Sequence, residues 1–250
     1  GYYRVNQADL ATAGFSPNID PRNLRLFEDG IERAIIVQGE QDGRLDGGDW
    51  IEFYGTALDT AYTDTRVYQL SAGSQPGLRI KRAKGKSSTP GDESFLFTTE
   101  LRERSLYFPG SKNGEREKFF GAVVSAELVD RTLRLQNLSA SAPSSATLEV
   151  GLQGVSAGAH NVKVRLNDAD VGAVTFEGRS STTARISVPQ SSLKEGDNSI
   201  QLVGAGEGDV SLMGSIRMSY WHRYAADDNA LQFTAAGSTQ LNLTGFSNAA

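Results

Sequence analysis

The sequence predicts a mostly β protein, in which a small N-terminal β-rich domain with one short helix precedes a β-sandwich domain of the jelly-roll type. Two observations support this prediction. Apolar residues in the second half alternate with polar or small residues at a period of two, which is the period of half-buried strands. Turn-forming residues separate these segments at a spacing of roughly ten residues, and no long segment has the period of a helix.

The short helix is expected close to the start of the chain. Asn6 can cap its first turn, Asp9 follows three residues later, and Leu10 supplies an apolar contact. Gly14 is placed to end the helix in a left-handed conformation.

Strands are expected through the rest of the N-terminal half. The segment 24–27 begins a strand, Asp29-Gly30 forms a turn, and 34–37 is the expected partner strand. Aromatic and branched residues, which suit a pleated surface, mark four further strands at 50–55, 66–70, 95–97 and 106–108.

The second half carries the clearer strand pattern. With a boundary between Leu101 and Phe119, we assign domains to 1–108 and 109–226, and a C-terminal β segment to 227–250. The alternating apolar positions of the second domain are Leu148, Val150 and Leu152; Val162, Val164 and Leu166; Ile186 and Val188; Ile200 and Leu202; Val210 and Leu212; and Ile216, Met218 and Tyr220.

The composition excludes several classes of function. With 25 Lys and Arg against 30 Asp and Glu, the net charge of -5 disfavours nucleic acid as a partner. The basic residues Lys81, Arg82, Lys84 and Lys86 therefore fit a solvated connector better than a nucleic-acid patch. The apolar runs are too short to span a membrane. The chain has no cysteine, and so it has no disulfide, thiolate metal site or cysteine nucleophile.

The two histidines do not form a recognisable catalytic pattern. His160 lies where a turn enters a strand, and we expect it to be solvated. His222 shares a strand face with Ile216 and Met218, so we expect a core or interface histidine bonded to a backbone carbonyl. The sequence contains neither a Gly-x-Ser-x-Gly elbow nor a His-Glu-x-x-His zinc helix. We therefore expect the chain to be non-catalytic.

The loop 42–52 is the first candidate binding site. Four carboxylates on this glycine-rich, sharply turning segment would suit calcium: Asp42, Asp46, Asp49 and Glu52. The calcium pattern of helix-loop-helix sites fails at its third and twelfth positions, which hold Arg44 and Phe53. The other interpretation is a tight β connection with no cofactor, in which the Asp side chains hydrogen-bond to the backbone and the glycines allow the turns.

Trp221 is the second candidate, together with Arg217 and Arg223. Strand alternation places these three side chains on the face opposite Tyr220 and His222. An aromatic ring among guanidinium groups could stack on a sugar or dock another domain. It could equally be covered by the first domain or by the tail around residues 231–233, and we favour covering by protein.

Two stretches carry a resemblance to known families. The first resembles the region upstream of the catalytic domain in gingipain-type cysteine peptidases, including the cell-surface sortase of the type IX secretion system; its segments are 3–5, 20–27 (DPRNLRLF), 49–55 (DWIEFYG) and 62–68 (YTDTRVY). The second is similar to galactose-binding-like jelly rolls, which recur as carbohydrate-binding modules and as non-binding spacers; its segments are 162–172, 186–189 and 193–200 (LKEGDNSI).

The resemblance implies a non-catalytic accessory region of a larger, secreted or cell-surface, gingipain-like peptidase. The chain opens within a strand pattern at Gly1–Val5, and Leu241–Phe246 resembles the lead-in to a catalytic domain. The implied role is a structural platform or a pro-region-like interaction module, whose partner is the downstream peptidase domain of the same chain. The alternative is a carbohydrate-binding module that tethers the parent protein to a glycan.

Overall fold

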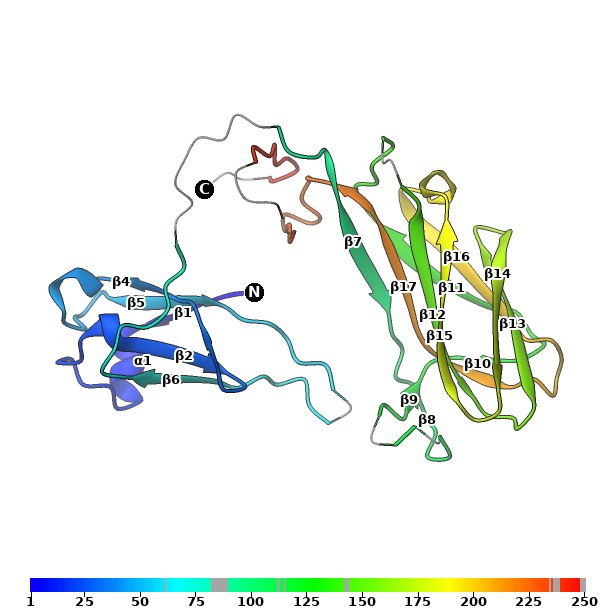
Figure 1. Cartoon of the computed structure of the whole chain (residues 1–250), viewed down its shortest axis with the longest axis horizontal. Helices are drawn as coiled ribbons and strands as arrows, with labels where there is room; N and C mark the ends of the chain where they lie inside the picture. Colours follow the sequence, from blue (N-terminus) through cyan, green and yellow to red (C-terminus); the bar gives the residue numbers. More distant parts are fainter. Residues whose placement is uncertain are drawn as a thin grey trace. The chain divides into compact units, whose positions relative to one another are not determined.

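The protein is mostly β, as predicted, and it forms two compact units at 1–84 and 85–250 (Figure 1). The computed structural model describes residues 1–60, 62–81, 90–111, 113–114, 116–141, 144–233, 235 and 239–247. The division lies earlier than the predicted boundary at 108–109. The strand β7 (Ser94–Leu101) explains this difference, because it pairs along its length with β17 (Ser211–Arg223) of the second unit.

The first unit contains two three-stranded antiparallel sheets and one short α-helix, α1 (Gln7–Thr12). One sheet has the order β1-β5-β4 and is formed by Tyr2–Asn6, Trp50–Tyr54 and Ile36–Gln38. The other has the order β3-β2-β6 and is formed by Ile31–Arg33, Leu24–Glu28 and Tyr68–Ala72. Two short 3-10 helices, η1 and η2, occupy Pro21–Asn23 and Glu40–Asp42.

The helix begins and ends as the sequence predicts. The Asp9 carboxylate accepts a hydrogen bond from the backbone N–H of Asn6, and Gly14 has a φ of 95°. Leu10 is the buried residue of α1 and joins the core of this unit. The buried members of that core are Leu10, Leu24, Leu26, Ile35, Val37, Leu45, Ile51 and Phe53.

The prediction that segment 34–37 pairs with β2 was wrong. Asp29 and Gly30 both have positive φ, so the hairpin turn is tight and pairing resumes at once with β3. The segment predicted as the partner instead crosses to the other sheet, where β4 pairs with β5. Ile35, between the two strands, is fully buried.

The second unit is an antiparallel β-sandwich. Its first sheet has the order β10-β17-β12-β15, with β7 also paired to β17; the strands not yet given are Val123–Val124, Ala146–Gly154 and Ser181–Val188. Its second sheet has the order β11-β16-β13-β14, formed by Val129–Leu135, Gly196–Val203, Ala159–Leu166 and Ala169–Glu177. A small hairpin of β8 (Leu106–Tyr107) and β9 (Phe119–Phe120) and the 3-10 helix η3 (Gln190–Ser192) complete the elements.

The sandwich core lies between these two sheets and contains the predicted apolar positions. Leu148, Val164 and Ile216 are fully buried, as are most of the residues that alternate with polar ones in the sequence. Two predicted strands, at 210–212 and 216–220, merge in the single long strand β17, which begins at Ser211. A register shift between Gly151 and Leu152 of β12 marks where β17 bulges.

Two further expectations concern connectors and membranes. Most of the basic connector expected at 81–91 lies outside the described residues. Within the described ranges, no helix is long and apolar enough to cross a membrane.

Candidate functional site

The outer face of the sheet that contains β17 holds the candidate residues around Trp221. Tyr220 and His222 point into the core and are at most 1% exposed, whereas Arg217 and Arg223 are exposed and Trp221 is half-buried. Strand alternation therefore divides the two faces of β17 as predicted. On the neighbouring strand β7, Leu96 lies opposite Trp221 and is 58% exposed.

Trp221 is held tightly by its surroundings. Gln190 accepts a hydrogen bond from the Trp221 backbone N–H at 3.2 Å and donates one to its carbonyl at 2.9 Å. The indole Nε1 is shielded from solvent and has no hydrogen-bond acceptor in the described part of the chain. The indole N–H is therefore not accessible to a ligand, and the side chain as a whole is half-buried.

The tail contacts a surface other than the face of β17 that carries Trp221. Phe233 packs against Phe95 at 5.9 Å and against Tyr224 at 5.2 Å between ring centroids. Phe95 lies opposite His222, on the inward side of the sheet. Phe233 therefore closes the end of the sandwich core on the side away from Trp221.

The two arginines do not stack on Trp221. Arg217 lies 3.6 Å from a Glu149 carboxylate oxygen, and Arg185 pairs with the same carboxylate at 2.7 Å. Arg223 donates to the side chain of Asn137 at 3.3 Å. Strand alternation places the predicted residues on one face, but each has its own partner.

The structure does not gather the carboxylates of the loop 42–52 into a metal site. Asp42 accepts from the Arg44 backbone N–H, Asp49 accepts from the Asp46 backbone N–H, and Glu52 pairs with Arg4 at 3.0 Å. No group of three or more Asp, Glu or His side chains in the described ranges could hold a metal ion. Three of these carboxylates, those of Asp42, Asp49 and Glu52, cap backbone N–H groups or neutralise Arg4, which favours the interpretation as a tight β connection.

The histidines have structural partners on the inside of the sandwich. His222 is buried, with Nδ1 against the Arg223 carbonyl and Nε2 3.0 Å from Asp227, which agrees with the prediction. The prediction for His160 was wrong, since it is 2% exposed, lies within β13 and stacks on Phe176. Its Nδ1 lies 2.7 Å from the Asp209 carboxylate, so it belongs to a buried hydrogen-bonded pair.

Two cavities provide further candidate sites. A cleft of about 730 Å³ in the second unit is lined by Arg223 and other polar residues, including Asp92, Glu93, Tyr224 and Asn242. Burial, with a smaller contribution from Asp92, raises the pKa of Tyr224. The first unit has a cavity of about 310 Å³ lined by Tyr3, Phe53, Arg66 and Tyr68, which sequence reasoning missed.

Comparisons with known proteins give a likeness of fold. No family model matches the chain, and no curated protein matches it. The solved structure of dimeric latent PorU from Porphyromonas gingivalis is similar over 91% of this chain and 24% of that chain, with a TM-score of 0.57 and 13% identity. The chain therefore spans about a quarter of the length of that protein.

Carbohydrate-binding modules resemble this chain more distantly. A family 36 module in complex with calcium and xylotriose is 18% identical over 49% of this chain and 99% of that chain, with a TM-score of 0.33. A family 35 module from Clostridium thermocellum is 13% identical over 52% of this chain and 94% of that chain, with a TM-score of 0.28. These likenesses are too distant to support an inference about binding.

Proposed function

We propose that this chain is a non-catalytic accessory region of a larger secreted or cell-surface protein, a gingipain-like cysteine peptidase, in which it serves as a structural platform and interaction module. The observation that carries the proposal is the fold likeness to PorU, which extends over both units and 91% of this chain but only a quarter of that protein. The motifs that resemble the region upstream of gingipain-type catalytic domains support the same conclusion.

The chemistry of the buried polar groups supports a structural role. His160 pairs with Asp209 and so connects segments that are distant in the sequence. His222 pairs with Asp227 and so joins β17 to the tail. A general base must instead reach a nucleophile and a substrate. The chain also lacks cysteine, the nucleophile of the parent class.

The partner in this proposal is the peptidase domain that lies downstream in the same parent chain. Co-expression of this chain with the separately encoded peptidase region, followed by co-purification, tests the proposal. We expect the two polypeptides to elute together in equal amounts, and we expect no hydrolysis by this chain alone. Separate elution under all salt conditions would contradict the proposed platform role.

The alternative is a carbohydrate-binding module, and the polar cleft that contains Arg223 and Tyr224 is the observation that favours it. The indole N–H of Trp221 is shielded from solvent, so it could not donate a hydrogen bond to a glycan. A glycan array distinguishes the two proposals. We expect no specific signal from the chain or from Trp221→Ala, whereas a signal lost in Tyr224→Phe would favour a glycan site in the cleft.

A further inference from the structure

The strand β1 has a free edge on one side. It pairs with β5, and the order β1-β5-β4 leaves no strand on its other side in the described part of the unit. Gly1 accepts from the Gly55 N–H and Gln7 donates to the Asp49 carbonyl, each at 2.8 Å. In an antiparallel pair, residues whose backbone groups bond to the partner strand alternate with residues whose backbone groups point outward. The N–H and C=O groups of Tyr2 and Arg4 therefore point away from β5. Unpaired backbone groups of this kind are a template for another strand.

An aromatic cavity opens beside this edge. It has a volume of about 310 Å³, and three of its walls are the rings of Tyr3, Phe53 and Tyr68. Tyr3 and Phe53 stack with centroids 5.6 Å apart, and Phe53 and Tyr68 are 5.1 Å apart. Tyr3 is 56% exposed although it lies on the same face as the core residue Phe53, so a large apolar surface is left open to solvent.

Arg66 also lines this cavity, and its guanidinium has unused donors. Nη1 lies 2.7 Å from both Glu28 and Asp29, and the Glu28 carboxylate is further held by Arg33 and Thr56. These contacts fix the position of the guanidinium. Nε is buried without an acceptor in the described ranges, and no hydrogen bond from Nη2 is found there either. An acceptor brought by a ligand could reach Nη2, which is not among the buried atoms.

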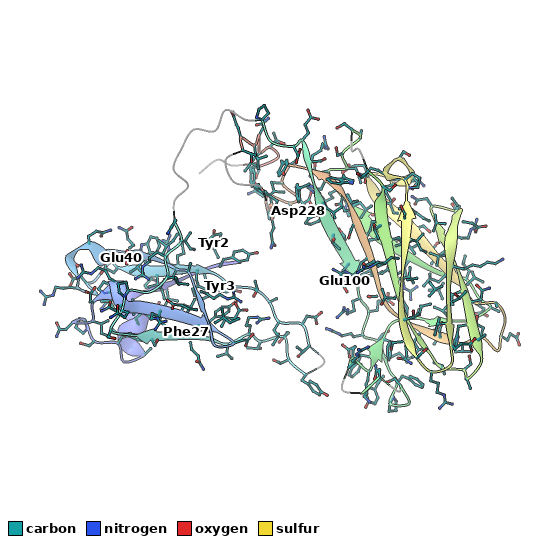
Figure 2. All side chains as sticks on the ribbon, viewed as in Figure 1. Tyr2, Tyr3, Phe27, Glu40, Glu100 and Asp228 are labelled. Carbon is teal, nitrogen blue, oxygen red and sulfur yellow. The ribbon has the colours of Figure 1, made fainter. Side chains whose placement is uncertain are left out.

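The opposite face of the same edge is aromatic as well. Tyr2 is 69% exposed and packs edge-on against Tyr54 at 5.5 Å, and Arg4 lies 4.1 Å above the Trp50 ring. Tyrosine, tryptophan and arginine are the residue types that dominate binding hot spots. Figure 2 labels Tyr2 and Tyr3, the two exposed tyrosines of β1. The free edge is thus flanked by aromatic side chains on both faces.

We propose that the edge of β1 binds an extended segment of a partner polypeptide by strand addition, with one large apolar side chain of that segment in the Tyr3 cavity. The unpaired backbone groups of Tyr2 and Arg4 select a polypeptide as the occupant, because its main chain supplies matching donors and acceptors. The Nη2 donor of Arg66 favours a backbone carbonyl beside the apolar side chain, because the carboxylates of Glu28 and Asp29 already contact the guanidinium. This inference rests on the proposed interaction role and assigns that role a location.

The test uses the intact chain and a displayed library of random peptides. One enriched peptide is titrated into the isotope-labelled chain while backbone amide signals and their hydrogen exchange are followed. We expect the amides of Tyr2 and Arg4 to shift and to exchange more slowly when the peptide binds. We also expect the enriched peptides to alternate polar residues with a large apolar one.

Two pairs of variants separate the backbone edge from the side chains. Arg4→Ala keeps the outward N–H, whereas Arg4→Pro removes it without breaking the ladder to β5. We expect Arg4→Pro to bind the peptide about tenfold more weakly than Arg4→Ala. Tyr3→Ala should weaken binding to a similar degree, whereas Tyr107→Ala, an exposed tyrosine of the second unit, should leave it unchanged. If Arg4→Pro does not fold, Tyr2→Pro removes the other outward N–H.

Several outcomes would overturn the proposal. Equal peptide affinity of Arg4→Pro and Arg4→Ala, or peptide-induced shifts confined to the second unit, would place the site elsewhere. A dimer in light scattering that Arg4→Pro disrupts would make a second copy the occupant. If the chain co-purifies with the peptidase region and Arg4→Pro does so equally well, the platform role stands and the β1 site fails.

Discussion

The Asp209 carboxylate joins β13 to the loop that precedes β17. It accepts hydrogen bonds from His160 at 2.7 Å, from the Asn161 N–H at 2.9 Å and from the Ala205 N–H at 3.0 Å. Burial raises the pKa of Asp209, but the hydrogen bonds from Ala205, Asn161 and His160 outweigh burial and hold that pKa below its usual value. The ionised carboxylate is therefore the form that stabilises the fold.

Replacing this carboxylate should lower stability in a pH-dependent way. We expect Asp209→Asn to cost about 1–3 kcal/mol of unfolding free energy near neutral pH, because buried donors lose their charged acceptor. The folded pKa is depressed, so the stabilisation is present above the ordinary value of about 3.9 and is lost as the pH falls through the folded value. Urea unfolding of both proteins across this range measures the difference.

The exposed Asp228 supplies the control, since Asp228→Asn should change little at any pH. A stability difference between wild type and Asp209→Asn that stays constant into strong acid would contradict the assignment. His222 could be predicted because it follows the alternation of β17. His160 could not, because Gly158 precedes it and its partner Asp209 is 49 residues away.

At the scale of elements, the loop 39–49 is shaped by contacts with its own backbone. Gly39 has a φ of 90°, and a Cβ built on it would lie 1.7 Å from a carboxylate oxygen of Asp49. Asp49 in turn accepts from the Asp46 N–H at 2.7 Å, and Leu45 is fully buried in the core of the first unit. The carboxylates and glycines of the loop therefore position Leu45.

A pair of glycine substitutions tests this close approach. Gly30 has a φ of 78° and open space where a Cβ would lie, so Gly30→Ala should cost about 1 kcal/mol through backbone strain alone. Gly39→Ala should cost clearly more, because it adds the collision with Asp49. Chemical denaturation of the two variants measures both values. Equal losses would mean that Asp49 moves aside freely.

The same loop should be insensitive to calcium. Because the carboxylates of Asp42, Asp49 and Glu52 are used by backbone N–H groups and by Arg4, we expect millimolar calcium to leave the melting temperature unchanged. A ligand that binds only the native state must raise the melting temperature. A calcium-dependent increase that Asp46→Asn abolishes would restore the metal interpretation.

The sequence could predict most strands but not all of their partners. Alternation identified β12, β13, β15, β16 and β17, because one face of each is buried. The sequence could not assign β3 to β2, since that pairing depends on two positive φ values at Asp29 and Gly30. The cavity beside Tyr3 could not be predicted from the sequence either, because its walls come from β1, β5 and β6 and meet only in the folded unit.

At the scale of the whole molecule, each unit has its own hydrophobic core. The buried residues of the first core lie between Leu10 and Phe53, and those of the second lie between Val124 and Tyr220. β7 belongs to the second unit, where Phe97 and Leu101 pack against its core. The unit that begins at residue 85 should therefore fold without the first unit.

Two truncated proteins test where the division lies. We expect 85–250 to unfold cooperatively, because it retains every strand of the sandwich. We expect 109–250, which follows the boundary predicted from sequence, to be much less stable, because it leaves the edge of β17 from Ile216 to Arg223 without β7. Thermal unfolding followed by circular dichroism compares them. Equal melting temperatures would show that β7 contributes nothing to the sandwich.

We propose an interaction platform, and not an enzyme or a glycan-binding module, as the role of this chain. Calorimetric titration of the intact chain with the separately produced peptidase region of its parent tests this claim most directly. The account predicts one-to-one binding with a dissociation constant at or below about 1 μM and a negative heat-capacity change. No heat of binding up to about 100 μM, together with specific heat on adding an oligosaccharide, would contradict it.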